Sequence, residues 1–125
     1  MTNSSQKETA IALLKAAAAG KVDEAFERYV GPGFIHHNPF FRGDADSLKQ
    51  AMRQNAVENP GKILEIKQVL QDGDRVVILS HIRQHTGDRG AAVVHIFRFS
   101  AGRVVEVWDI GQPIPEDSPN QNGMF

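Results

Sequence analysis

The sequence has no cysteine among its 125 residues, which excludes disulfide bonds and thiolate catalysis. It has no run approaching the roughly 18 uninterrupted apolar residues of a membrane-spanning helix, and its start lacks the basic segment and apolar core of a secretory signal. Neither sign of charge dominates, since 14 Lys and Arg face 15 Asp and Glu in a dispersed pattern. We therefore expect a cytoplasmic protein that binds neither nucleic acid nor a membrane, and whose partner is a small neutral or weakly polar ligand.

The first half of the chain has the apolar spacing of helices. Ser5 followed three residues later by Glu8 forms a capping box and predicts the start of a helix that ends at Gly20. Two further helices are predicted over residues 23–29 and 45–58, because each apolar stripe is followed by a segment that contains glycine and proline.

The second half changes to an alternation with period two, which predicts strands joined by short turns. The strands are expected near residues 62–70, 75–86, 91–99 and 103–110. Helices followed by strands indicate an α+β fold, in which a cone-shaped, curved antiparallel sheet packs its concave face against three N-terminal helices. We expect a single domain over residues 1–125. The tail from Gln112 to Phe125, with three prolines, is interpreted as a lid or as an arm onto a neighbour that does not extend the sheet.

A carboxylate, Asp109, lies in the last predicted strand between apolar neighbours. Burying an unpaired carboxylate is costly, so the group tends to keep its proton, and a carboxyl balanced in this way can move protons. Asp109 is therefore the first candidate for a general acid or base. The structural alternative is a carboxylate that caps the turn at Gly111 or pairs with Arg83 or Arg103.

The connection before this strand decides which residues accompany Asp109. A three-residue loop, Ser100-Ala101-Gly102, would place His95, Phe97, Val105, Val107 and Asp109 on one face, with His95 about 7–8 Å from Asp109 as a diagonal neighbour. A two-residue loop would place His95 and Asp109 on opposite faces. The alternation on the preceding strand adds His81 to the predicted pocket face, and both histidines have the alternative of being satisfied core residues.

The pair His37-Asn38 forms a second polar cluster in a segment, residues 34–39, that is expected to be extended. Pro39 holds Asn38 in an extended conformation, and adjacent residues of such a segment point in opposite directions. Both side chains therefore face one cavity only if the chain bends. Although the chain has five histidines, their spacing matches no metal-binding motif, and we expect no metal.

Trp108 has the opposite parity to Asp109 and is predicted to lie on the other face of the sheet, where Glu106 and Arg98 form a charge pair. That face also carries Val94, Ile96 and Ile110, and no helix remains to cover it. We therefore expect it to be buried in a homodimer.

Several of these segments together resemble a known family. They are His37-Asn38-Pro39, the strand from Gly90 to Phe99, the segment from Glu106 to Glu116 and the terminal Asn122-Gly123-Met124-Phe125. Over residues 29–125 the combination is similar to the SnoaL-like polyketide cyclases of the nuclear transport factor 2-like superfamily.

The resemblance implies the cone fold and an intramolecular aldol condensation that needs no cofactor. In these cyclases an aspartate on the last long strand is the acid–base group, and a histidine on the preceding strand lies beside it. Asp109 and His95 match those positions in order and in strand placement, whereas His37 and Asn38 match a motif of a bacterial subgroup. The substrate does not transfer with the fold and need not be polycyclic.

Three functions remain in competition. The first is an acid–base enzyme without cofactor that acts on a small carbonyl compound through an enolate, by aldol condensation, cyclisation or isomerisation. Asp109 and His95 would be catalytic, with His81 as a second candidate donor to the oxyanion, and the substrate would contact His37, Asn38, His81, Phe97 and Val107. The second is epoxide hydrolysis, which requires two carboxylates with an arginine between them, whereas the sequence offers one interior acid. The third is a binding or dimerisation module without catalysis.

Overall fold

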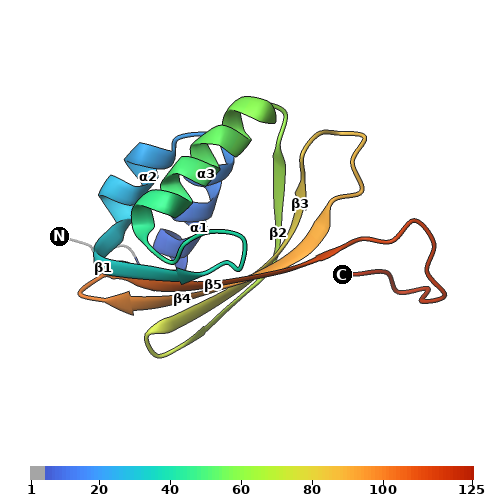
Figure 1. Ribbon diagram of the computed structural model, residues 1–125. Coiled ribbons are helices and arrows are strands. Elements are labelled where there is room, and N and C mark those ends of the chain that lie inside the picture. The colour runs from blue at the N-terminus through green and yellow to red at the C-terminus, as the bar shows by residue number, and fades with distance from the viewer. Residues whose placement is uncertain (1–4) are drawn as a thin grey trace.

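The computed structural model describes residues 5–125, which fold into three helices and a five-stranded sheet. The helices are α1 (Gln6–Ala18), α2 (Val22–Tyr29) and α3 (Ala45–Glu58). The strands are β1 (Val30–His37), β2 (Ile63–Asp72), β3 (Arg75–Arg83), β4 (Ala91–Ser100) and β5 (Arg103–Pro113). All three helices lie on one side of the curved sheet (Figure 1), which confirms the predicted α+β cone.

The strands follow the order β1-β5-β4-β3-β2, and β2 to β5 form the predicted antiparallel meander. The edge strand β1 differs from the expectation, because it pairs with β5 in the parallel direction. Its extended part was predicted, but not its place in the sheet. The segment Gly31-Pro32-Gly33 contains residues that are rare inside strands, so it was not predicted as part of one. The register of β1 with β5 also shifts between Val30 and Ile35.

Caps and apolar contacts explain the helical layer. The hydroxyl of Ser5 accepts the N–H of Glu8 at 3.1 Å, as the capping box predicts, and Asp44 caps α3 by accepting the N–H of Ser47 at 2.9 Å. The core lies between the helices and the concave face of the sheet. Its most buried members include Ala10, Val22, Ala25, Val76, Ile78, Phe97 and Val104.

The β4–β5 hairpin has a two-residue turn, so the predicted three-residue loop is wrong. Ser100 pairs with Arg103, and the two residues between them have φ of 52° and 77°, the left-handed values of a type I′ turn. A bulge leaves Val105 without a partner on β4 and restores the parity that the shorter turn would have changed. His95 consequently lies directly opposite Asp109, closer than the predicted diagonal position.

The C-terminal tail begins later than expected, because Gln112 and Pro113 still pair with β4. Beyond them the chain forms neither helix nor strand, and the ring of Phe125 packs against His81 with 5.0 Å between ring centroids. The end of the tail therefore contacts the convex face of the protein's own sheet. Within residues 5–125, no helix combines the length and the hydropathy needed to cross a membrane.

Candidate functional site

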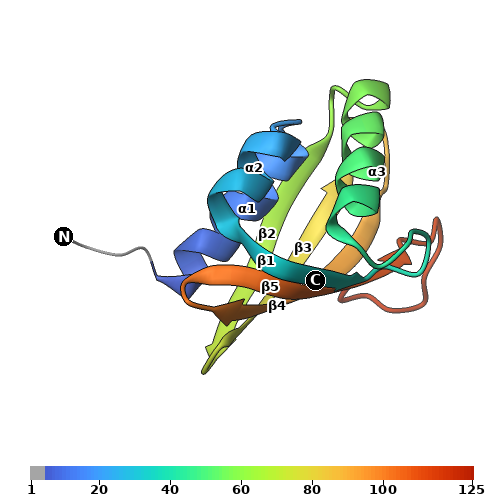
Figure 2. The ribbon, with the colours of Figure 1, turned by 60° about the vertical axis from the view of Figure 1, so that its left-hand side comes forward.

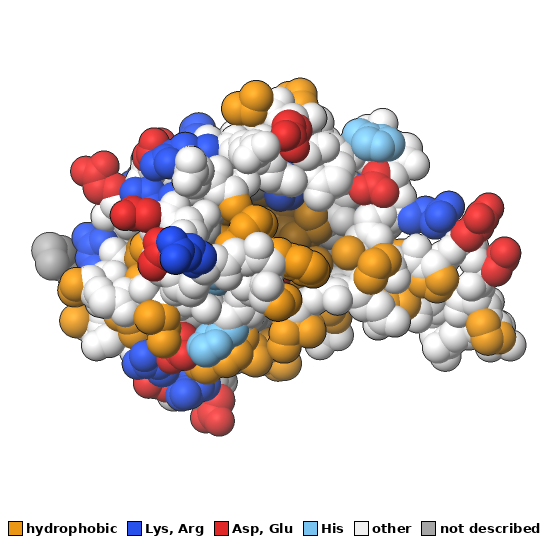
Figure 3. Space-filling model, in the orientation of Figure 1, with side chains coloured by type: hydrophobic (Ala, Val, Ile, Leu, Met, Phe, Trp, Pro, Cys, Tyr) orange, Lys and Arg blue, Asp and Glu red, His pale blue; other side chains and the backbone are white. Residues whose placement is uncertain are grey.

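A cavity of about 610 Å³ lies between the helices and the concave face of the sheet. Figure 2 shows α1 and α2 on one side and α3 on the other, above the curved strands, and side chains of all three helices line the cavity. Hydrophobic side chains line the hollow that opens on the surface in Figure 3. The polar groups in the wall are few. They are Asn38, Asn55, Lys62, Gln84, Asp88, His95 and Asp109.

Asp109 lies in this wall with a partner facing each of its carboxylate oxygens. The amide Nδ2 of Asn38 donates to Oδ2 at 2.9 Å, and Nε2 of His95 lies 3.5 Å from Oδ1, slightly beyond an ordinary hydrogen bond. The side chain of Asp109 is 29% exposed, so the carboxylate is oriented and still accessible from the cavity.

His95 is a neutral donor in this arrangement. Burial lowers the pKa of its imidazole, the carboxylate of Asp109 opposes that shift, and the charge of Lys62 adds to it. Nδ1 is buried and has no hydrogen-bond partner within residues 5–125, which places the ring proton on Nε2, toward Asp109. The ring of Phe97 stacks on the imidazole at 5.8 Å and fixes its orientation.

Asn38 reaches Asp109 because β1 and β5 run in the same direction. His36 is paired with Val107, so the next inward position along β1 brings Asn38 level with Asp109. His36, only 5% exposed, accepts the backbone N–H of Asn38 at Nδ1 and lies 2.5 Å from the carbonyl of Arg42 at Nε2. His36 is therefore a positioning residue, which the sequence analysis missed although its parity with Phe34 marks it as inward.

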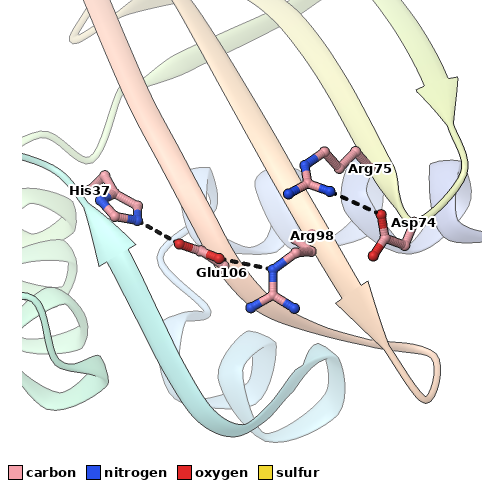
Figure 4. Close-up of polar contacts among 5 residues, drawn as sticks. All are labelled: His37, Asp74, Arg75, Arg98 and Glu106. Carbon is pink, nitrogen blue, oxygen red and sulfur yellow. Dashed lines mark hydrogen bonds and ion pairs between the residues drawn. The ribbon is translucent and has the colours of Figure 1, made fainter.

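His37 lies on the convex face, so its predicted place in the cavity is corrected. Its Nε2 lies 2.6 Å from Oε2 of Glu106, and its ring stacks on Trp108 at 5.0 Å. Arg98 donates from Nε to the other oxygen of Glu106 at 2.8 Å, in the charge pair that the sequence predicted (Figure 4). The hydrogen bond from His37, together with Arg98, lowers the pKa of Glu106.

His81 also lies on the convex face and not in the cavity. The pairing of Ile78 with His95 turns Ile78 inward, so the alternation on β3 is the reverse of the one expected. Nε2 of His81 lies 2.7 Å from the carbonyl oxygen of Arg89, which holds the β3–β4 connection. The predicted convergence of His37 and His81 with Asp109 therefore does not occur.

The remaining predicted contacts, Phe97 and Val107, both line the cavity beside His95, Asn38 and Asp109. The two are opposite one another on β4 and β5 and form the apolar floor next to the polar pair. Their roles with a substrate stay predictions. Among the described residues, no group of three His, Cys, Asp or Glu side chains is arranged to hold a metal ion.

Lys62, which the sequence analysis did not select, is the basic side chain in the cavity wall. Its Nζ donates to Oδ1 of Asn55 at 2.8 Å. Burial lowers the pKa of Lys62, and the charge of Asp109 opposes that shift. Its place two residues before Leu64, which also lines the cavity, was the signal available in the sequence.

The second acid of the wall, Asp88, is engaged in the β3–β4 connection. Its carboxylate accepts the backbone N–H groups of Gln84 at 2.9 Å and Gly90 at 3.0 Å, and these bonds lower its pKa. Within residues 5–125, no arginine lines the cavity. The arrangement of two carboxylates about an arginine, which epoxide hydrolysis requires, is therefore not formed by the cavity wall.

Comparisons with known proteins agree with the fold. A family model described as a SnoaL-like domain matches residues 10–107. A solved NTF2-like protein of unknown function from Cytophaga hutchinsonii superposes with a TM-score of 0.72 at 13% identity, over 90% of this chain and 94% of its own. No functionally curated protein matches the chain in sequence.

Two further solved structures are similar at the level of the fold. A proposed polyketide cyclase from Acidithiobacillus ferrooxidans has a TM-score of 0.70 at 20% identity, covering 90% of this chain and 92% of its own. A proposed isomerase of the SnoaL-like family from Agrobacterium tumefaciens has a TM-score of 0.70 at 13% identity, covering 86% and 97%. At these identities the likeness establishes the cone fold and leaves the chemistry to the residues of the cavity.

Proposed function

Because the chain belongs to the SnoaL-like domain family, we propose that it is an acid–base enzyme without cofactor that acts on a small carbonyl compound. The reaction is removal of a proton from the carbon next to the carbonyl group, followed by aldol condensation, cyclisation or isomerisation of the enolate. The fold and family support a ligand-binding or enzymatic role, and the cavity favours this chemistry.

One observation carries the proposal: a carboxylate at the wall of an apolar cavity is held at one oxygen by Asn38 and faces a neutral imidazole at the other. Asp109 accepts the proton of the substrate carbon. In a cavity with few polar groups, the attraction of each donor for the developing enolate oxygen is weakly screened.

His95 is the donor for that oxygen. Its Nε2 lies 3.5 Å from Oδ1 of Asp109 and makes no short hydrogen bond there, so the N–H group can donate to an oxygen of the substrate. The proton that Asp109 has taken returns to the enolate, or to the alkoxide formed when the enolate attacks a second carbonyl group. Polyketide cyclisation and isomerisation, the reactions named for two structural neighbours, both fit this sequence of steps.

Exchange of the α-proton tests the proposal without knowledge of the natural substrate. The protein is incubated in D2O with a panel of apolar β-keto compounds, and loss of the α-proton signal is followed by NMR. Asp109→Asn should reduce the rate about a hundredfold or more, the contribution typical of a positioned base. His81→Gln, on the convex face, is the matched control and should exchange at the wild-type rate.

Two results would contradict the proposal. Exchange that is equally fast in Asp109→Asn would assign the base elsewhere. Saturable binding of the panel without exchange in the wild type would identify a ligand-binding module, which is the alternative that the sequence leaves open.

A further inference from the structure

We propose that Lys62 is an anion-binding subsite of the cavity, and that the ligand is an apolar carbonyl compound that also bears an anionic oxygen, such as a carboxylate. The inference rests on the proposed function and specifies its substrate class. The anionic oxygen binds the ammonium group of Lys62, and the carbon that loses its proton faces Asp109.

The hydrogen bonding of Lys62 is incomplete. An ammonium group has three N–H donors, and one of them is used by the neutral side chain of Asn55 at 2.8 Å. No carboxylate lies within 4.0 Å of Nζ among residues 5–125, where every ion pair involves other side chains. Two donors of a half-buried cation are therefore available to a ligand in the cavity.

Lys67 provides the contrast on the other side of the sheet. Its Nζ lies 3.4 Å from a carboxylate oxygen of Glu65 and over the ring of Phe125, so its charge is neutralised and covered within the chain. Lys62, by comparison, carries its charge into a largely apolar wall, where burial disfavours the charged form. An anionic ligand would remove that cost.

The charges around the cavity also give the ligand an orientation. Lys62 and Asp109 are close enough for their charges to interact, and Lys62 acts on His95 as well. An anion is repelled by Asp109 and attracted by Lys62, so its charged oxygen lies on the Lys62 side. The neutral carbon next to it then approaches the base, and the apolar remainder fills the space lined by α1 and α3.

Binding of 4-nitrophenol tests the subsite without turnover, because its phenolate presents one anionic oxygen on an apolar ring and is distinguished from the phenol by its absorbance. The wild-type protein should bind the phenolate in preference to the phenol. Lys62→Met, which keeps the length of the side chain, should weaken phenolate binding about tenfold or more, as expected for a lost hydrogen bond between charged groups, and leave binding of the phenol nearly unchanged. Lys67→Met is the matched control and should bind as the wild type does.

Asp109→Asn provides an independent arm, since removal of the opposing charge should tighten phenolate binding. Equal phenolate affinity in Lys62→Met and the wild type would overturn the inference. So would a mass increase at Lys62 after borohydride treatment with an apolar ketone, because the amine would then act as a nucleophile.

The subsite and the proposed catalysis can fail separately. If α-proton exchange persists while phenolate affinity is the same in Lys62→Met and the wild type, only the subsite is wrong. If phenolate binding depends on Lys62 and exchange is absent, the subsite stands and the proposed catalysis fails.

Discussion

Replacing Asn38 with aspartate would put two carboxylates in contact. In the wild type, Nδ2 of Asn38 lies 2.9 Å from Oδ2 of Asp109, and two unit charges at 2.9 Å repel by about 6 kcal/mol at an effective dielectric constant of 20. The alternative is to keep one carboxyl protonated. At pH 7, about three units above the ordinary aspartate pKa of about 3.9, this costs about 4 kcal/mol. Proton retention is the cheaper state, so Asn38→Asp should lose up to about 4 kcal/mol at pH 7 and about 1.5 kcal/mol at pH 5.

The sign follows from the proton count. The folded variant holds a proton that the unfolded chain releases above pH 4, so the free energy of unfolding should fall as pH rises. Urea denaturation at pH 5 and pH 7 measures the difference. The exchange variant Asn38→Asp with Asp109→Asn restores an amide–carboxylate pair and should recover most of the stability, while α-proton exchange stays low. A loss in Asn38→Asp that is the same at both pH values would refute the assigned contact.

Three further predictions concern the backbone, pH and association. Gly90 has φ of 73°, and a Cβ there would lie 2.1 Å from a carbonyl oxygen of β3, so Gly90→Ala should cost about 3 kcal/mol or more in thermal denaturation. Gly73→Ala, with φ of 60° and open space, should cost only about 1 kcal/mol, and equal losses would contradict the clash. Burial lowers the pKa of His95, so below about pH 6.5 the imidazole is protonated in the unfolded chain and stays neutral in the folded protein. The free energy of unfolding should therefore fall as the pH drops below about 6.5, and it should fall less steeply in His95→Gln. We also propose that the convex face forms a homodimer; Ile110→Lys, at a position 60% exposed, should yield monomers in sedimentation, whereas Val57→Lys on α3 should not, and a monomeric wild type would refute it.

The sequence predicted an element correctly where a local pattern is compatible with only one structure. The third helix was predicted over residues 45–58 and is found there, because its apolar stripe and its terminating Asn59-Pro60-Gly61 are local signals. Asp109 and His95 were correctly predicted to share one face, although the predicted turn was one residue too long. A shorter turn and a bulge each shift the alternation by one residue, and the two shifts cancel.

The other errors concern parity and pairing that depend on distant partners. Apolar residues occupy both faces of β3, so the sequence does not say whether His81 or Ile78 faces inward, and only the pairing with His95 on β4 decides it. His37 and Asn38 were both assigned to the cavity, and the parallel pairing of β1 selects Asn38 alone. In the sequence, Lys62 has the position of a solvent-exposed lysine at the start of a strand, and only its contact with Asn55 on α3 places it in the cavity wall.

The bulge at Val105 gives β5 one residue more than a regular pairing with β4 requires. With the turn fixed at Ala101 and Gly102, a regular hairpin of the full sequence would place Trp108 opposite His95 and turn Asp109 to the convex face. Deletion of Val105 would remove the bulge and leave Glu106 opposite Arg98 and Asp109 opposite His95. A single-codon deletion of Val105 should therefore leave the cavity wall in place, because the bulge takes up one extra residue, whatever its side chain, and in this way keeps Asp109 in the cavity.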